Sequence, residues 1–254
     1  MIFNAEAIWQ AVAPLLPGFT VEVLPQVDST NSELMRRARA GAGEPVLLVG
    51  ERQTAGRGRL GRGWESAPGA SLTFSLGLPL APADWSGLSL AVGASVADSL
   101  HPAIRLKWPN DLWLDDRKLG GILIETANFG AGGCGQRYAV IGIGLNIAAP
   151  AADGLSTPPA ALHELLPAAD AASVLERLAA PLVADVLRFA ESGFAPFQAR
   201  FDARDALRGR AVTLSDGTAG VAQGVNASGS LLVHTAAGPQ AVSSSEVSVR
   251  PAAP

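Results

Sequence analysis

The pattern of apolar and polar positions begins with a clear helix signal. Thr30 and Glu33 have the spacing of a capping box and Gly41 follows as a stop, so we predict a helix over residues 31–40. Helical spacing returns further along the chain, where Pro181 is expected to kink or split one helix. These later helices are predicted over residues 85–100, 170–193 and 196–208.

Strands are predicted where short apolar or alternating runs lie between turn residues. Residues 46–49 form a continuous apolar run, and residues 72–76 alternate with a period of two. Residues 51–70, between these two strands, fit no periodicity, and a loop of that length inside a compact domain is usually functional. Further strands are predicted over residues 104–107, 112–114, 121–126 and 138–147.

The texture of the chain changes after Arg210. Short Val- and Leu-rich runs follow one another there, separated by turn signals at residues 215–217 and 227–229. We therefore predict an α+β fold, with a mixed β-sheet and packed helices over residues 1–206. A small β domain is expected over residues 207–254.

Composition narrows the class of protein. The chain of 254 residues is 48% apolar and 17% charged, which excludes intrinsic disorder. Nineteen Lys and Arg against 23 Asp and Glu give a net charge of -4, so nucleic-acid binding by the whole surface is not expected. The single cysteine, Cys134, excludes an internal disulfide and is interpreted as a loop thiol. With no signal peptide and no membrane-spanning run, we expect a soluble cytoplasmic protein.

The segment from 53 to 64 combines glycines and arginines and contains no acid. We call residues 56–64 the Gly-Arg loop. Glycine lets the backbone approach a ligand closely, and arginine presents a planar fork to phosphate or carboxylate, so the loop fits an anion-binding site. A solvated basic loop, or an arginine-glycine segment that touches nucleic acid, fits this composition equally well.

Two further constellations carry polar groups on predicted strands and turns. Residues 107–111 read Lys-Trp-Pro-Asn-Asp and residues 116–121 read Asp-Arg-Lys-Leu-Gly-Gly, which would suit a shared anionic ligand or two ordinary surface lysines. Asn146 lies inside the apolar run of residues 142–147, and an unsatisfied buried amide there would cost about 1–3 kcal/mol. Asn146 is therefore bound either by backbone groups or by the edge of a ligand.

The sequence lacks other common phosphate and metal motifs. No GxxxxGK[ST] segment occurs, so phosphates are not held by a P-loop. His101, His163 and His234 have no metal-like neighbours and are interpreted as surface or capping residues, so no direct metal motif is present.

Together, these motifs resemble those of the biotin protein ligase family. The Gly-Arg loop alone is a weak signal, whereas the loop combined with Lys-Trp-Pro-Asn-Asp is highly specific. The resemblance implies a class II synthetase-like catalytic fold, shared with lipoate ligases, and the C-terminal part resembles the family's SH3-like β-barrel in texture only. The matching segments follow the family's order and spacing: residues 28–31, 56–64, 107–112, 116–123 and 142–147.

The resemblance implies a two-step reaction that uses ATP and Mg²⁺. Biotin is first activated to biotinyl-5′-AMP with release of pyrophosphate. A lysine of a biotin carboxyl carrier protein, or of that domain in a biotin-dependent carboxylase, then takes the biotin as an amide. A carboxylate that approaches a phosphate must be shielded by cations, which the arginines and lysines of these motifs would supply.

Site residues follow from the same resemblance, position by position. Lys118 would hold the reacting oxygens, Arg59 would belong to the loop that closes over the adenylate, and Asp111 would orient the incoming lysine or a metal ion. The implied biotin-binding residues are Ser29, Thr30, Asn31, Gln53, Arg57, Gly58, Arg59, Lys118 and Gly121. The implied nucleotide-binding residues are Arg62, Trp64, Asn110 and Asn146.

One departure from some family members concerns the N-terminus. Only 27 residues precede Asp28, too few for the helix-turn-helix domain of the bifunctional members, so a monofunctional ligase that binds neither DNA nor membrane is expected. A homodimer is left open. Two alternatives from other classes are a lipoate or octanoate protein ligase and an arginine-glycine nucleic-acid-binding module, the latter disfavoured by the acidic net charge.

Overall fold

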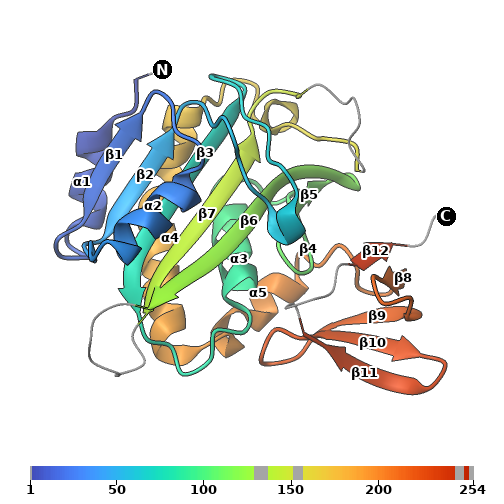
Figure 1. The fold of residues 1–254 in the computed structure, drawn as a ribbon. Coiled ribbons are helices and arrows are strands. Elements are labelled where there is room, and N and C mark those ends of the chain that lie inside the picture. Colours follow the sequence, from blue (N-terminus) through green and yellow to red (C-terminus); the bar gives the residue numbers. More distant parts are fainter. Residues whose placement is uncertain (1, 129–136, 151–156, 244–248, 252–254) are drawn as a thin grey trace. The chain divides into compact units, whose positions relative to one another are not determined.

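The computed structural model describes residues 2–128, 137–150, 157–243 and 249–251 (Figure 1). The loop thiol predicted at Cys134 lies outside these residues. Contacts group the chain into two compact units, the first formed by Met1–Ala81 and Arg117–Ala184 and the second by Pro82–Asp116 and Asp185–Pro254. The domain boundary predicted after residue 206 stays a prediction.

The first unit is built on a mixed sheet whose strands run in the order β1-β2-β3-β7-β6. Strands β1 and β2 are parallel, and each of the following pairs is antiparallel. This sheet confirms the predicted α+β class. Its strands are β1 (Thr20–Leu24), β2 (Val46–Gly50), β3 (Ser71–Leu80), β6 (Arg117–Asn128) and β7 (Arg137–Asn146).

Helix α2 (Thr30–Arg39) lies on one face of this sheet (Figure 1). Its residues Leu34, Met35 and Ala38 pack against a buried apolar cluster contributed by the strands, which includes Leu48 and Val140. The other helices of this unit are α1 (Ala5–Val12), the 3-10 turns η1 (Arg59–Gly61) and η2 (Leu162–Glu164), and the first part of α4 (Ala171–Ser192).

The same face becomes small and polar beyond the apolar cluster. Directly paired residues on antiparallel strands share a face, so Ser75 of β3, Gly142 of β7 and Leu123 of β6 line up across the sheet. The next row on that face holds Thr73, Gly144 and Gly121, in the same strand order. Glycines and hydroxyls at these positions leave room for side chains that come from outside the sheet.

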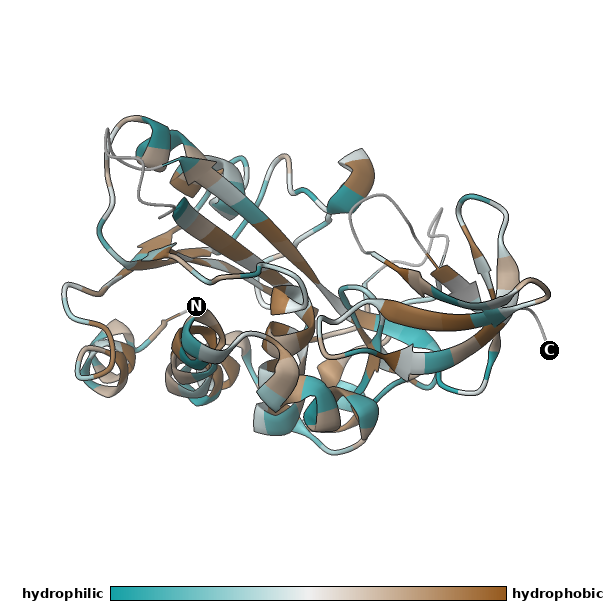
Figure 2. Cartoon of the chain, turned by 90° about the horizontal axis from the view of Figure 1, so that it is seen from below, coloured by the Kyte–Doolittle hydropathy of each residue, from teal (hydrophilic) through white to brown (hydrophobic). Residues whose placement is uncertain are grey.

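The opposite face of the sheet is apolar, as the alternation of strand residues requires. Phe74, Leu76, Ile141 and Ile143 have between 0% and 3% of their surface exposed. In Figure 2 the strands carry brown stretches interrupted by white and teal segments, and the helices are of mixed colour.

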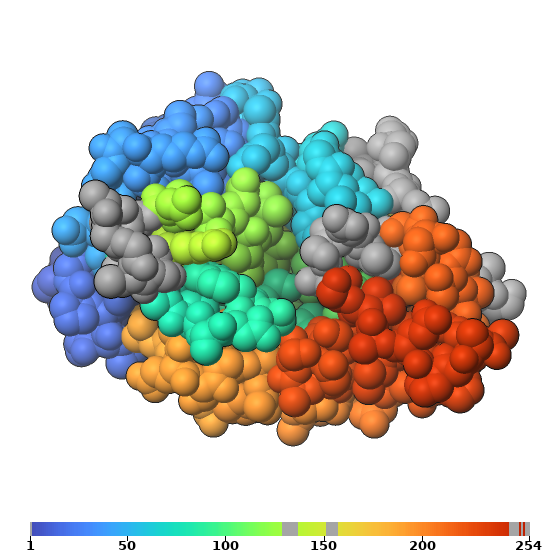
Figure 3. Space-filling model, turned by 60° about the horizontal axis from the view of Figure 1, so that its bottom comes forward, coloured from blue at the N-terminus to red at the C-terminus, as the bar shows by residue number. Residues whose placement is uncertain are grey.

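The second unit contains the β4–β5 hairpin, several helices and a five-stranded antiparallel sheet in the order β11-β10-β9-β8-β12. In Figure 3 the residues coloured dark orange to red, which include those of the C-terminal strands, lie together on the surface. Its elements are α3 (Leu88–Leu100), β4 (Arg105–Lys107), β5 (Asp111–Leu114), η3 (Ala195–Phe197), α5 (Gln198–Asp202), β8 (Ala211–Leu214), β9 (Ala219–Val225), β10 (Leu231–Thr235), β11 (Gly238–Val242) and β12 (Val249–Pro251).

The turn between β9 and β10 is fixed to the Lys-Trp-Pro-Asn-Asp segment. The indole Nε1 of the fully buried Trp108 donates to the carbonyl oxygen of Gly229 at 3.0 Å. A Cβ atom on Gly229 would lie 2.7 Å from the Cα of Gly87, so the turn fits only with glycine there. On the adjoining segment, the hydroxyl of Ser89 donates to the carbonyl of Pro109 at 2.6 Å.

Most predicted elements are present with shifted ends, and four details differ. Ser29, not Thr30, caps α2, because Ser29 is extended and its hydroxyl accepts from the backbone of Ser32. Helix α3 starts at Leu88 because Gly87 is left-handed (φ 82°). Helix α4 is not split, since it runs through Pro181 as one element. The helix predicted over 196–208 ends at residue 202, after which the chain forms turns.

Two elements near the N-terminus were not predicted, namely α1 and β1. Strand β1 lies at the edge of the sheet and its residues are exposed or half-buried, so it lacks the apolar run that marks a central strand. No described helix combines the length and the hydropathy that crossing a bilayer requires.

Candidate active site

The start of α2 contributes a run of three buried polar residues to the first unit. Ser29, Thr30 and Asn31 are between 3% and 4% exposed, although all three carry polar side chains. The backbone nitrogen of Thr30 donates to Oε1 of Gln53 at 2.8 Å, and its hydroxyl donates to the same oxygen at 3.2 Å. The structure thus joins the predicted residues 29–31 and Gln53 in one cluster.

The amide of Asn31 is held on both of its polar ends. Its Nδ2 donates to the carbonyl of Leu123 at 3.1 Å and to Oε2 of Glu125 at 2.9 Å. Its Oδ1 accepts from the hydroxyl of Ser75, which is fully buried, at 2.6 Å. These three partners fix which end of the amide is the oxygen.

Two glycines of β7 make room for this cluster. A Cβ atom on Gly142 would lie 2.1 Å from Oδ1 of Asn31, and one on Gly144 would lie 2.4 Å from the ring of Trp64. Side chains never approach that closely, so the Gly-Ile-Gly spacing is required by two residues that rest on the strand. The predicted residues Trp64 and Asn31 therefore sit over adjacent positions of the same face.

The Gly-Arg loop is a narrow hairpin. The nitrogen of Gly58 donates to the carbonyl of Arg62 at 2.7 Å, and the nitrogen of Trp64 donates to the carbonyl of Gly56 at 2.9 Å. A Cβ atom on Gly56 would lie 2.2 Å from the carbonyl oxygen of Trp64, so the two arms meet at a position that admits only glycine. At the tip, Leu60 has a left-handed backbone (φ 56°) and is 58% exposed.

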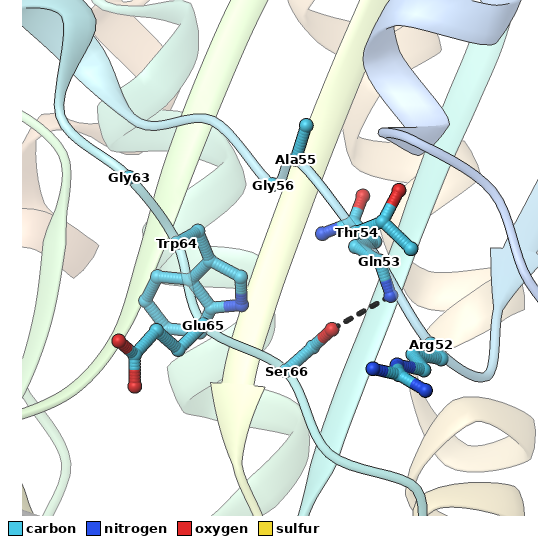
Figure 4. A pocket seen from close by; sticks show the side chains of 9 residues that line it. All are labelled: Arg52, Gln53, Thr54, Ala55, Gly56, Gly63, Trp64, Glu65 and Ser66. Carbon is cyan, nitrogen blue, oxygen red and sulfur yellow. Dashed lines mark hydrogen bonds between the residues drawn. The ribbon is translucent and has the colours of Figure 1, made fainter.

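A pocket of about 480 Å³ opens between the arms of this segment (Figure 4). Gln53 lies at one side, where its backbone nitrogen donates to the hydroxyl of Ser66 at 2.8 Å. Trp64 also lines the pocket, and its buried Nε1 makes no hydrogen bond with any described residue. The lining residues are Arg52, Gln53, Thr54, Ala55, Gly56, Gly63, Trp64, Glu65 and Ser66.

Lys118, Gly121 and Asn146 lie together at the β6–β7 edge of the site. Gly121 pairs with Gly144, beneath the Trp64 ring. Nδ2 of Asn146 donates to the carbonyls of Lys118 and Ala160 at 3.2 and 3.0 Å. Backbone carbonyls thus accept both hydrogens of the Asn146 amide nitrogen, which is the first of the two possibilities stated from the sequence. Only the amide oxygen of Asn146 is left to contact a ligand.

Asn110 and Asp111 belong to the second unit, where Asp111 begins β5. Nζ of Lys107 lies 3.7 Å from Oδ2 of Asp111 and 5.0 Å from the centre of the Trp113 ring. Both charged side chains are largely buried, with 12% and 16% of their surface exposed. The pair is a partly desolvated acid and base beside a tight turn.

Carboxylates beside the start of α2 are stabilised in their charged form. The Arg36 guanidinium hydrogen-bonded to Asp28 lowers the pKa of that carboxyl, and Arg37 together with Arg36 lowers the pKa of Glu33. The Asp28 carboxylate in turn accepts from the backbone nitrogen of Ser29 at 2.7 Å. Charge at this helix end therefore supports the geometry of residues 29–31.

Sequence reasoning missed Ser75 and Glu125, which both contact Asn31 directly. Ser75 is one of several polar residues that alternate with apolar ones on β3, and Glu125 is one of several polar residues on β6, so neither is distinguished by its local pattern. Their relation to Asn31 depends on the register of β3, β7 and β6, which the order of residues along the chain does not display.

Comparisons with known proteins agree with this geometry. Residues 23–146 match the model of the Biotin/lipoate A/B protein ligase family, and residues 207–250 match that of the Biotin protein ligase C terminal domain. A biotin--[acetyl-CoA-carboxylase] ligase of Paracoccus denitrificans is 34% identical over 243 residues, covering 89% of this chain and 98% of that protein. The chain belongs to the biotin protein ligase family. The family predicted from the sequence motifs is confirmed.

Two further members of the biotin protein ligase family are similar to this chain, one in sequence and one in structure. The biotin--[acetyl-CoA-carboxylase] ligase of Mycobacterium tuberculosis is 41% identical over 138 residues, which span 50% of this chain and only 49% of that protein. The biotin protein ligase from Aquifex aeolicus, solved in complex with biotin and ATP, has a TM-score of 0.78 at 28% identity. That match covers 91% of this chain and 99% of the Aquifex chain.

Proposed function

We propose that the protein is an ATP-dependent biotin protein ligase. In the first step a carboxylate oxygen of biotin attacks the α-phosphorus of ATP, the bond to the bridging oxygen breaks, and pyrophosphate leaves. In the second step the amine of a carrier lysine attacks the acyl carbon of biotinyl-5′-AMP. AMP leaves with its electron pair, the amine loses a proton, and an amide forms.

One observation supports this proposal above the others. The polar face of the first unit gathers the α2 start, the pocket beside Gln53, the Gly-Arg loop and Lys118 around two glycines of β7. The Asn31 amide oxygen and the hydroxyls around it suit the ureido group of biotin, and cationic side chains suit its carboxylate. The Aquifex ligase of similar fold was solved with biotin and ATP.

The first step needs cations because it brings two anions together. A carboxylate and a phosphate charge 4 Å apart repel each other by about 1 kcal/mol in water and about 4 kcal/mol at an effective dielectric constant of 20. In this proposal Lys118 binds the reacting oxygens, and Arg57, Gly58 and Arg59 cover them. Catalysis is then positioning and charge neutralisation rather than proton transfer.

The nucleotide is assigned to the other side of the same motifs. Trp64 would stack near adenine, with Arg62, Asn110 and Asn146 on the nucleotide. Asp111 would orient the incoming lysine, because a carboxylate attracts an ammonium group and then stabilises it as it approaches.

Mg²⁺ is proposed to arrive with ATP. Among the described residues no group of three or more His, Cys, Asp and Glu side chains is placed to hold a metal ion. The magnesium ion of a nucleotide commonly keeps several waters and binds phosphate oxygens with one or two carboxylates, and Asp111 is a carboxylate of that kind. Bound there, the ion would neutralise phosphate charge.

The acceptor protein and the cellular compartment are also proposals. We infer that the acceptor is the biotin carboxyl carrier domain of a biotin-dependent carboxylase, in the cytoplasm, without DNA or membrane contact. The small β domain over 207–254 and a possible homodimer also stay predictions.

Mass spectrometry of a purified carrier domain tests this function. The domain is incubated with biotin, MgATP and the protein, and the expected result is a single added biotinyl group. A carrier whose acceptor lysine is replaced by arginine should stay unmodified, as should a reaction without ATP. No mass gain with an active commercial ligase as positive control would contradict the proposal.

Lipoate in place of biotin tests the alternative that the family name also covers. Lipoate carries no ureido group, so the residues around Asn31 have nothing to recognise. Pyrophosphate exchange into ATP should depend on biotin and not on lipoate, and the reverse dependence would favour a lipoate ligase.

A further inference from the structure

Glu125 on β6 has no assigned role, yet its carboxylate connects two residues that do. Oε2 of Glu125 accepts from Nδ2 of Asn31 at 2.9 Å and forms an ion pair with Nη2 of Arg57. Its side chain is 26% exposed, and that of Arg57 is 42% exposed. Because both bonds end on the same oxygen, moving either donor alters the bond made by the other.

The first effect of Glu125 is on the orientation of the Asn31 amide. An amide nitrogen has two hydrogens, and those of Asn31 go to the carbonyl of Leu123 and to Glu125. Oδ1 has two lone pairs, of which one accepts from Ser75. Asn31 can therefore meet a ligand only as an acceptor, which suits an N–H group such as that of a ureido ring.

The second effect is on the Gly-Arg loop. The bonds described for the hairpin arms join the loop to itself, between Gly58 and Arg62 and between Trp64 and Gly56. The pair between Arg57 and Glu125 instead connects the loop to β6. It holds one arm of the hairpin on the face where Asn31 lies.

We propose that Glu125 is a positioning residue that couples ligand recognition by Asn31 to closure of the Gly-Arg loop through Arg57. The same carboxylate oxygen fixes the Asn31 amide as an acceptor and anchors the loop above it. The inference rests on the proposed function, because the ligand that Asn31 meets is taken to be biotin. A loop anchored beside the recognition site is retained over the adenylate while the carrier lysine arrives.

Two substitutions separate the two effects. Glu125→Gln keeps an oxygen that can accept from Asn31 but removes the charge that attracts Arg57, whereas Glu125→Leu removes both. Glu22→Gln is the matched control, since Glu22 pairs with Arg37 in the same unit, at 2.8 Å, away from the loop. The readouts are KM for biotin and kcat in pyrophosphate exchange, free biotinyl-AMP in solution, hydrogen exchange of residues 56–64, and thermal unfolding.

For Glu125→Gln we expect faster exchange of the loop and more released biotinyl-AMP, each by about twofold to fivefold, the range of partly exposed ion pairs. KM for biotin should stay within about twofold of the wild type. Glu125→Leu should in addition raise KM by about fivefold or more, because a buried amide donor loses its partner. Glu22→Gln should leave all three quantities unchanged.

A double mutant tests whether Arg57 and Glu125 act on the loop through the same ion pair. Arg57→Leu should speed loop exchange by itself, and adding Glu125→Gln should give no further increase if both act through one pair. The inference is overturned if Glu125→Gln matches Glu22→Gln, or if the two single effects on loop exchange simply multiply. Failure of the proposed function looks different, since the wild type itself would then make no biotinyl-AMP.

Discussion

The start of α2 and the Gly-Arg loop lie on the same face of the sheet but are built in contrasting ways. Ser29, Thr30 and Asn31 are almost fully buried, and their polar atoms are bonded to strands and to Gln53. The loop is largely exposed and is held by hydrogen bonds between its own arms, by Trp64 on Gly144 and by the Arg57 pair.

This difference in burial indicates that the two regions have different roles in the site. Buried, fully bonded groups are preorganised, so they recognise a ligand without reorganising at that moment. Segments with few buried contacts are drawn from the least stable parts of a fold and can open and close. Specificity is expected to come from the α2 start and retention of the intermediate from the loop.

The largest expected effect is at Lys118, which lies on strand β6 and belongs to neither the α2 start nor the loop. Lys118→Met should fold normally and lose formation of biotinyl-AMP by about 10²–10³-fold, the typical effect of removing one electrostatic donor. Lys118→Arg should rescue only part, since a planar fork and a compact ammonium place charge differently. Biotin-dependent pyrophosphate exchange measures this, and normal exchange by Lys118→Met would refute the assignment.

A second prediction tests whether the α2 start depends on the space above Gly142. Gly142→Ala places a Cβ atom 2.1 Å from the Asn31 oxygen, which is buried and cannot move away easily. We expect a stability loss of about 1–3 kcal/mol and a KM for biotin raised by about tenfold or more. Gly63→Ala is the control for the stability loss alone, because nothing lies within 4 Å of that Cβ position, whereas Gly63 belongs to the Gly-Arg loop and lines the pocket. An equal loss of stability in the two variants would contradict this account of β7.

The Gly-Arg loop is tested at Arg59, near its tip. Arg59→Gly should still form biotinyl-AMP but retain it poorly, so activated biotin escapes and labels other proteins. An unrelated lysine-rich protein added to the reaction should become biotinylated by this variant about tenfold more than by the wild type, an order-of-magnitude expectation for loss of one charge-assisted contact. Arg59→Lys should label the lysine-rich protein less than Arg59→Gly does, because it keeps a positive charge. Normal synthesis without added labelling would argue against a retaining loop.

The smallest effect concerns pH and the charges beside the α2 start. The pKa values of Asp28 and Glu33 are lowered in the folded protein, chiefly by Arg36 and Arg37 respectively, so their ion pairs stabilise the fold above the ordinary values of 3.8 and 4.5. That contribution is lost as the pH falls through the lowered values. Arg36→Met should thus lower Tm by about 1–3 °C at pH 7 and by less at pH 3, measured by thermal unfolding. A pH-independent difference would show that Arg36 acts through packing.

Elements that depend on local sequence patterns could be predicted from the sequence. Helix α2, strands β2 and β3 and the loop between them were predictable because capping residues, apolar runs and glycines act over a few positions. Strand β1 was not predictable, because its residues are exposed or half-buried and so form no apolar run. Its parallel pairing with β2 is visible only in the folded structure.

The candidate site was predictable only where family motifs mark it. Residues 29–31, Gln53 and the Gly-Arg loop are brought together as expected, whereas Asn110 and Asp111 belong to the other compact unit. Glu125 could not be found because it lies 94 positions from Asn31, and only the sheet register brings the two together. A role in positioning leaves no local pattern.

The two glycines of β7 restrict how this sequence can diverge. Gly144 supports the Trp64 ring and Gly142 supports the Asn31 amide, each without space for even one methyl group. A change at either glycine is therefore tolerable only in a background where its partner, 80 positions away for Trp64 or 111 for Asn31, has already become smaller. Such pairs are epistatic: each position limits which residues the other can accept, and neither limit is visible to a comparison that treats positions one at a time.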